Sequence, residues 1–145
     1  MHVKAARAGA RRIGRMLVHS GTLAEHHRRC DALFAAARQA AIARAAAEVV
    51  ACVAELRDAL LGHFRYEEEH VFPLYEQHSG AASTESLRAQ HDDMRAILWM
   101  LATASAEEER ARYCADLEEL QAIFDTHAAD EEGRMYPLFE RLLGR

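Results

Sequence analysis

The sequence has 145 residues and a mass of 16.3 kDa, the size of a single domain with one hydrophobic core. Half of the residues are apolar and 28% are charged, with only 7 glycines and 2 prolines, which excludes collagenous and disordered chains. The net charge is −5, and such an acidic chain is not expected to have nucleic acid as its main partner. No stretch approaches the ~20 apolar residues needed to cross a bilayer, and the first residues lack the apolar run of a secretory signal. We therefore expect a cytoplasmic protein that does not enter a membrane.

The first predicted element is a short basic N-terminal extension over residues 1–21. It holds five of the 18 basic side chains and no acidic one, which leaves 13 basic against 23 acidic side chains in the remainder. Such a segment suits a nucleic-acid arm, a targeting segment or a loosely packed helical extension, and we favour the last. A Ser-Gly pair is expected to end the extension. Because Thr22 and Glu25 have the spacing of a capping box, we expect the domain to span residues 22–145 and to begin there with a helix.

Three further breaks divide the domain into four predicted helices. They lie within residues 39–47, 77–83 and 103–106. The first break has no glycine or proline, and we place a turn there because one continuous helix would be improbably long. Ser83 or Thr84 is expected to cap the third helix, and Ser105 with Glu108 has the capping-box spacing before the fourth. No alternating pattern of a β-strand competes with these helices.

The sequence repeats itself with an offset of 64 residues. Residues 63–76 read HFRYEEEHVFPLYE and residues 127–140 read HAADEEGRMYPLFE, so a histidine, two glutamates and a Pro-Leu pair return at matching positions. The same offset relates the helices that precede these segments. Neither helix pair could bury its apolar stripe alone. We therefore predict an all-α fold, an up-down-up-down antiparallel four-helix bundle with a pseudo-twofold helix-pair repeat.

Each predicted helix carries an apolar stripe with alternating spacings of four and three, the pattern of a face that points into a bundle. Histidines and glutamates interrupt these stripes at one level, because the start of one helix lies beside the end of the next in an antiparallel bundle. The candidate metal ligands are His27, His63, Glu67, His91, His127 and Glu131. Buried carboxylates require cationic partners, which two divalent metal ions would supply. Imidazole and carboxylate without thiolate suit iron or manganese first and zinc second.

These residues resemble the hemerythrin-like HHE cation-binding domain over residues 22–143. Two HxxxE motifs, each followed closely by an aromatic-Pro pair, and two further placed histidines carry the resemblance. It implies a non-haem di-iron centre bridged by Glu67 and Glu131, with room for an oxo or hydroxo bridge. The oxygen-carrying hemerythrins have a second histidine where Arg95 stands and end in HxxxxD, whereas here the second carboxylate is Glu131. The ligand set is closer to that of proteins resembling the repair-of-iron-centres group.

The function implied by this resemblance is the binding of O2, NO or a peroxide at iron, in oxygen or redox stress response or in iron handling. Whether the protein turns over a substrate stays open at this point. The alternative is a non-catalytic metal- or gas-sensing module that signals through a partner. Either form is compatible with a monomer or a homodimer.

Five other residues near the motifs receive weaker predictions. Glu68 and Glu132 come five residues after their histidines, about 140° around a helix, and are expected to face solvent or an adjacent helix. A role in supporting the metal ligands from outside is the less favoured alternative for these two residues. His26 is expected to be exposed. His70 returns to the core-facing stripe, where we expect it to close the end of the bundle rather than to gate a pocket or supply a proton. Cys30 is expected to be a buried, unreactive thiol.

Overall fold

The computed structural model describes residues 20–142, and every secondary-structure element in this range is helical. The longer elements are α2 (Ser20–Ile42), α3 (Ala46–Tyr66), α4 (Phe72–Ser79), α5 (Glu85–Thr103) and α6 (Arg110–Leu142). A π-helical turn, Glu67–Val71, joins α3 to α4, and a 3-10 turn, Ala81–Thr84, precedes α5. Residues 1–19 of the predicted basic extension lie outside the described residues. The prediction of an all-α chain is confirmed for residues 20–142.

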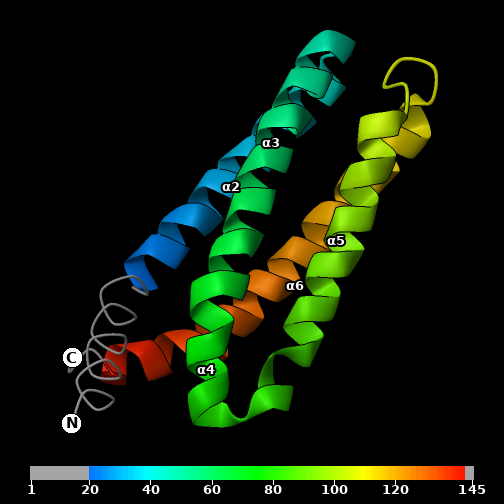
Figure 1. The fold of residues 1–145 in the computed structure, drawn as a ribbon. Helices are drawn as coiled ribbons and strands as arrows, with labels where there is room; N and C mark the ends of the chain where they lie inside the picture. Colours follow the sequence, from blue (N-terminus) through cyan, green and yellow to red (C-terminus); the bar gives the residue numbers. More distant parts are fainter. Residues whose placement is uncertain (1–19, 143–145) are drawn as a thin grey trace, which may run out of the picture.

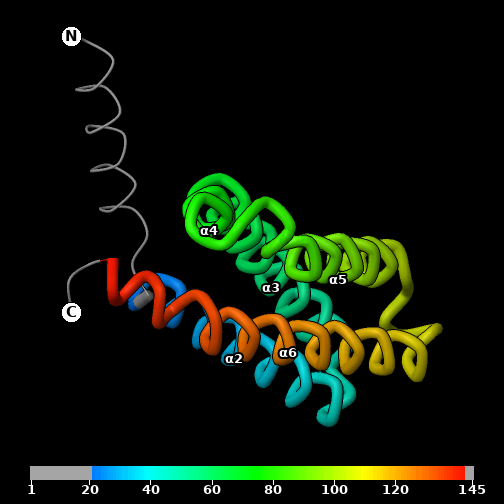
Figure 2. Tube along the Cα trace, turned by 90° about the horizontal axis from the view of Figure 1, so that it is seen from below, coloured from blue at the N-terminus to red at the C-terminus, as the bar shows by residue number. Residues whose placement is uncertain are grey.

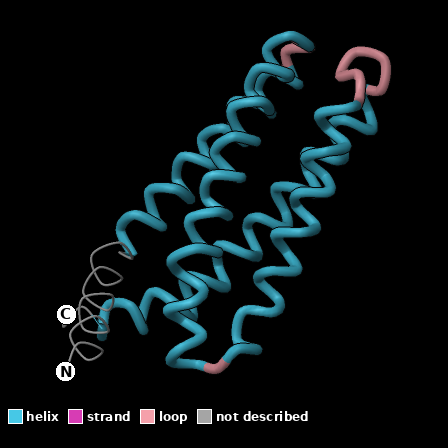
Figure 3. Tube along the Cα trace, viewed as in Figure 1, coloured by secondary structure: helices cyan, strands magenta, loops and turns pink. Residues whose placement is uncertain are grey.

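The helices form a four-helix bundle in which α3, the π-turn and α4 act as one rod. In Figure 1 the chain runs along α2, returns along α3 and α4, and then passes along α5 and back along α6. Helix α2 packs against α3 and α5 packs against α6, while contacts of α2 with α6 and of α3 with α5 close the bundle. Figure 2 shows α2 and α6 beside each other along one side of the bundle. The loops are short and lie at the two ends (Figure 3).

The core consists of two apolar clusters with a polar layer between them. The larger cluster contains Phe34, Leu60 and Phe124, and the smaller contains Leu23, Leu87 and Met135. The bundle has four such rods: α2, α3 with the π-turn and α4, α5, and α6. Along each rod, the buried histidines and glutamates lie between members of the two clusters. The fold therefore encloses the polar layer in apolar side chains on both sides along the bundle axis.

The turn between α2 and α3 is a Schellman motif, and the prediction of a turn within residues 39–47 is confirmed. The backbone N–H of Ala45 donates to the carbonyl of Ala40 at 3.0 Å, and that of Arg44 donates to Ala41 at 3.2 Å. This motif requires a left-handed residue after the helix, and Arg44 fills that position with φ of 56°. Glycine usually occupies it because a Cβ atom is strained there.

The other helix ends differ in part from the predictions. The predicted break before Thr22 is wrong, because Ser20, Gly21 and Thr22 lie within α2. A glycine costs a helix only about 1 kcal/mol, which the burial of Leu23 at 0% exposure offsets. The capping-box spacing of Thr22 with Glu25 therefore does not mark a helix start.

The two later breaks lie close to their predicted positions. Helix α4 continues to Ser79, and Gly80 turns the chain with φ of 94°. Thr84 is the N-cap residue of α5, but its hydroxyl donates to the carboxylate of Glu76 instead of capping the helix. Before α6, the Ser105 hydroxyl accepts a hydrogen bond from the backbone N–H of Glu108 at 3.2 Å, as the capping-box spacing predicts.

None of the helices within residues 20–142 is both long enough and apolar enough to cross a membrane.

We predict that Arg44→Gly stabilises the protein. Glycine removes the Cβ strain of the left-handed conformation, and this gain exceeds the entropy that glycine adds to the unfolded chain, for a net increase of about 0.5–1 kcal/mol in the free energy of unfolding. Equilibrium unfolding in urea measures the change. Arg44→Ala is the matched control, since it removes the same side chain but keeps Cβ. Equal stability of the two variants would contradict the backbone explanation.

Candidate metal centre

All four rods of the bundle contribute to one buried polar cluster. It consists of the six residues predicted as ligands: His27 from α2, His63 from α3, Glu67 from the π-turn, His91 from α5, and His127 and Glu131 from α6. None of the six is more than 3% exposed. The structure therefore brings together all the side chains selected from the sequence.

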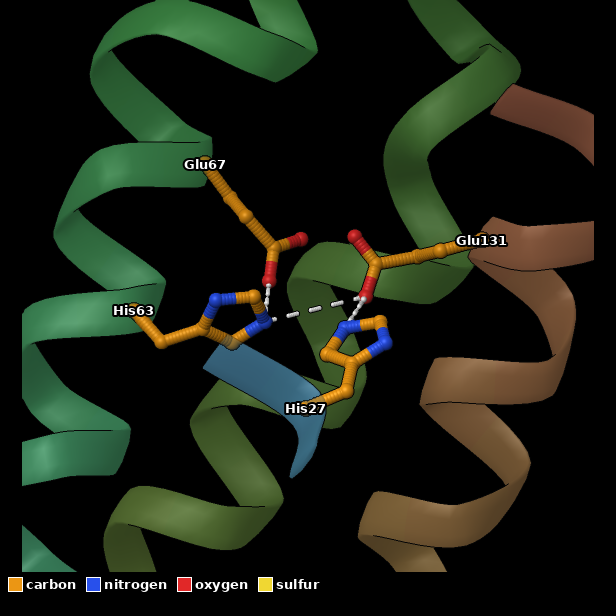
Figure 4. Close-up of side chains that lie close together, drawn as sticks. All are labelled: His27, His63, Glu67 and Glu131. Carbon is orange, nitrogen blue, oxygen red and sulfur yellow. Dashed lines mark ion pairs between the residues drawn. The ribbon is translucent and has the colours of Figure 1, made fainter. Parts of the chain in front are cut away.

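The first half of the cluster joins His27 and His63 to the two carboxylates. The Nε2 atom of His27 lies 3.3 Å from Oε1 of Glu131, and Nε2 of His63 lies 3.9 Å from the same oxygen. His63 Nε2 also pairs with Oε1 of Glu67. Figure 4 shows these four side chains pointing toward one another. Their ligand-type atoms lie within 4.8 Å of one another, close enough to hold one metal ion.

The second half joins His91 and His127 to the same carboxylates. His127 Nε2 lies 2.9 Å from Oε1 of Glu131 and 3.4 Å from Oε1 of Glu67. His91 Nε2 lies 3.8 Å from Oε1 of Glu67 and 3.2 Å from Nε2 of His127. Glu67, His91 and His127 form a second group able to hold a metal ion. Because Glu67 belongs to both groups, the two positions adjoin.

Hydrogen bonding within the cluster is incomplete, and this is the test of whether its residues fit metal ions. Among residues 20–142, five buried atoms make no hydrogen bond of suitable geometry, although some lie close to an opposite charge: His27 Nε2, His63 Nε2, Glu67 Oε2, and both carboxylate oxygens of Glu131. A buried polar group without a partner costs about 1–3 kcal/mol, and more if it is charged. Cations between the carboxylates and imidazoles would satisfy these atoms together. The nitrogen and oxygen donors fit iron, manganese or zinc.

Without metal, protons partly balance the carboxylates. Burial alone would lower the pKa of His63, but Glu67 and Glu131 beside it raise that pKa to about 9. The same two carboxylates outweigh the burial of His127 and raise its pKa to about 10. For Glu67, burial raises the pKa, whereas His63 and the hydrogen bonds around the carboxylate hold it well below its usual range. Two imidazolium ions thus stand where cations would bind.

The outer nitrogen of every histidine in the cluster has a partner of its own. His91 Nδ1 donates to Glu68 at 2.8 Å and His127 Nδ1 donates to the amide oxygen of Gln90 at 2.9 Å. His27 Nδ1 lies 3.3 Å from a carboxylate oxygen of Glu132 and 3.2 Å from the Tyr136 hydroxyl, and His63 Nδ1 lies 3.0 Å from Nδ1 of His26. A hydrogen on Nδ1 leaves the lone pair of Nε2 directed at the carboxylates, the form in which imidazole binds a metal.

Sequence reasoning missed His26, Gln90 and Tyr136 as outer partners, and it did not favour that role for Glu68 and Glu132. Glu68 and Glu132 do face adjacent helices, as predicted, but each contacts a histidine of the cluster there. His26 is only partly exposed and contacts His63, which corrects its prediction as an exposed residue. The signal was present in the repeat, because His26 matches Gln90 and Glu68 matches Glu132 at the 64-residue offset.

His70 does not return to the core, which corrects its predicted place on the core-facing stripe. The N–H of Phe72 donates to the carbonyl of Glu67, five residues earlier, so the π-turn contains one extra residue. An extra residue rotates the side chains that follow by about 100°. His70 is therefore 37% exposed beside Glu69, while Val71 is fully buried. Cys30 agrees with its prediction, since burial raises the pKa of its thiol to about 12.

Comparison with known proteins agrees with this geometry. The family model of the hemerythrin HHE cation binding domain matches residues 19–141. No curated protein and no solved structure matches the chain. The family match covers the described helices except the last residue of α6, and it includes the whole buried cluster. The chain therefore belongs to the hemerythrin HHE cation-binding domain family.

Proposed function

We propose that this protein holds a pair of iron ions in the buried cluster and uses them to bind O2, NO or a peroxide. The ligands are the six buried residues, with Glu67 and Glu131 bridging the ions. The observation that carries the proposal is the group of buried nitrogen and oxygen atoms without hydrogen-bond partners, all directed at the interior of one cluster. A purely structural polar layer would leave these atoms unsatisfied at a high cost.

Bound ferrous ions would supply electrons and a coordination position for a small ligand. The protein would orient the ligands, exclude water from the cluster and hold protons near it. The outer partners fix the histidine rings, and the two apolar clusters limit the access of water along the bundle axis. The Tyr136 hydroxyl, 3.2 Å from His27 Nδ1, and the half-exposed Glu132 connect this edge of the cluster to the surface by hydrogen bonds.

The 64-residue repeat explains why the ligands come in matched sets. We propose that the bundle is two antiparallel helix pairs of common plan, each giving one HxxxE motif and one further histidine. The outer partners support this, since the contact of His26 with His63 has its counterpart in that of Gln90 with His127. The expected setting is the cytoplasm, with the protein acting as a monomer or a homodimer.

The first test is the iron content of protein produced in iron-rich medium, combined with its absorption spectrum. We expect about two irons per chain and visible charge-transfer bands that bleach on anaerobic reduction and return in air, as in carboxylate-bridged di-iron bundles. Sustained consumption of peroxide or NO would establish an enzyme, whereas a single stoichiometric spectral change would favour the sensing module. Substoichiometric metal without a visible band would overturn the proposal.

Glu131→Gln tests the ligand set. The amide has nearly the same shape but removes a buried negative charge and a metal-binding oxygen, so we expect the iron content to fall by half or more. Glu69→Gln is the matched control, because Glu69 is 59% exposed in the neighbouring π-turn. Iron content measured by elemental analysis should be unchanged in the control. Equal iron content in the two variants would remove Glu131 from the site.

The metal-free protein should lose stability as the pH rises above neutrality. The pKa values of His63 and His127 are raised from 6.5 to about 9 and about 10 in the folded state. Their contribution to stability is therefore complete below pH 6.5 and disappears as the pH rises to about 10. Glu67 acts oppositely, since its depressed pKa gives stability above its usual pKa of 4.5 that is lost only in acid.

Urea unfolding of chelated protein between pH 6.5 and 10 measures this effect. His127→Gln is the comparison, because it removes one of the two raised groups and should flatten the decline. Iron-loaded protein should show little decline, since metal binding becomes more favourable as protons leave the imidazoles. Constant or increasing stability of the chelated protein over this range would contradict the assignment.

A further inference from the structure

The two metal positions share Glu67 and have matching histidine pairs, but they differ in their surroundings. We call the group of His27, His63, Glu67 and Glu131 the His27 position, and the group of Glu67, His91 and His127 the His91 position. The histidines that name them lie 64 residues apart in the sequence, and so do their outer partners Glu132 and Glu68. The groups that contact Glu132 differ from those that contact Glu68. An inference from this difference rests on the proposed function.

On the His91 side, an arginine fixes the outer carboxylate. Arg95 Nη2 donates to both carboxylate oxygens of Glu68, at 2.8 and 2.9 Å, and Glu68 accepts from His91 Nδ1 at 2.8 Å. The guanidinium group also lies 5.5 Å from the centre of the Phe64 ring. Phe64 stacks on His91 with a centroid distance of 4.2 Å, and Phe72 stacks on it at 5.2 Å. His91 is fully buried. Its Nδ1 atom is held by Glu68, and its ring is held by Phe64 and Phe72.

On the His27 side, the position that matches Arg95 is Asp31. Glu132 lies 3.3 Å from His27 Nδ1, and its side chain is 52% exposed, against 29% for Glu68. Among the ion pairs of the described residues, the partner of Glu132 is His27 alone. Burial and the negative charge of Asp125 raise the pKa of Asp31, whereas His27 lowers it, so the position that matches Arg95 holds an acidic side chain and no arginine clamp.

We propose that the two positions exchange metal at different rates, with the ion in the His91 position retained and the ion in the His27 position entering and leaving first. A ligand held by its outer partner and by stacked rings does not need to be ordered when metal binds, and it seldom swings away to release metal. His27 also contacts rings, since Tyr136 stacks on it at 6.2 Å and Phe124 meets it edge-on at 5.7 Å, so the two halves differ chiefly in the clamp on the outer carboxylate. Glu132, exposed and without an arginine partner among the described ion pairs, leaves negative charge beside His27 that attracts an incoming cation. Arg95 and Asp31 are therefore positioning residues that make the two halves of the centre unequal.

The test measures release of Fe²⁺ from the full-length, anaerobically loaded protein to a colour-forming bipyridine chelator. The wild-type protein should release iron in two phases of equal amplitude. His27→Gln should abolish the fast phase, and His91→Gln should abolish the slow one. These two variants assign each phase to a position.

Exchanging the charges at Arg95 and Asp31 then tests whether these residues cause the difference in release rate. Arg95→Asp copies the other half of the repeat and should accelerate the slow phase by about tenfold or more, the usual effect of losing an outer-sphere contact. Asp31→Arg makes the reciprocal change and should slow the fast phase by a similar factor, because an arginine there can hold Glu132. Arg57→Asp is the control for charge, since its ion-pair partner among the described residues is Asp58, and it should leave both phases unchanged.

The outcomes separate this inference from the proposed function. Protein that binds no iron would overturn the proposed function itself. Two bound irons released at a single rate, or two phases that neither exchange variant alters, would overturn the inequality while leaving the iron site intact. If circular dichroism shows that Arg95→Asp does not fold, Asp31→Arg decides alone, and an unchanged fast phase in that variant overturns the inference.

Discussion

Two carboxylates that face four imidazoles inside an apolar core are the interaction on which the rest of the molecule depends. Glu67 and Glu131 are both fully buried, and neither contacts an arginine or lysine among the described ion pairs. An isolated buried carboxylate is so costly that it must be protonated or neutralised. Protons on His63 and His127 provide a partial solution in the metal-free chain, and metal ions would provide a fuller one, because they also satisfy the atoms that lack hydrogen-bond partners. Folding and metal binding are therefore coupled through one charge balance.

The burial of apolar residues on either side of the polar layer offsets the free energy that is lost by burying the layer. Each rod places a buried apolar residue before and after its polar ones, as Leu23 and Phe34 do around His27 in α2. These two clusters hold the helices in register, and the outer partners orient the rings within that register. A polar layer of this kind breaks the ordinary preference for an apolar core, and such breaks are typical of functional sites. The same enclosure that makes the layer costly also keeps water away from it.

The sequence predicted the helices and the six clustered residues, because both follow from periodicity within single helices and from the internal repeat. It did not predict features that depend on contacts between helices or on small differences in backbone geometry. The π-turn at Glu67 is one example, since Pro73 has its counterpart in Pro137, yet α6 continues through Pro137 without a break. The misplacement of His70 follows from this. The role of Glu68 was not the favoured prediction for another reason, because its partner His91 comes from α5 and no spacing within one helix reveals that contact.

The repeat also indicates where the two halves of this centre have diverged. Two helix pairs with identical surroundings would give two equivalent metal positions, and the histidines of the two positions do match at the 64-residue offset. The differences lie in the residues around the ligands rather than in the ligands themselves. At matching positions of the two halves stand His26 and Gln90, Phe72 and Tyr136, and Asp31 and Arg95. These changes leave the ligand atoms in place but alter the charge, hydrogen bonding and exposure behind them. Because outer contacts adjust the strength and mobility of a ligand without removing it, they would allow one ion of the proposed centre to be held while the other is exchanged.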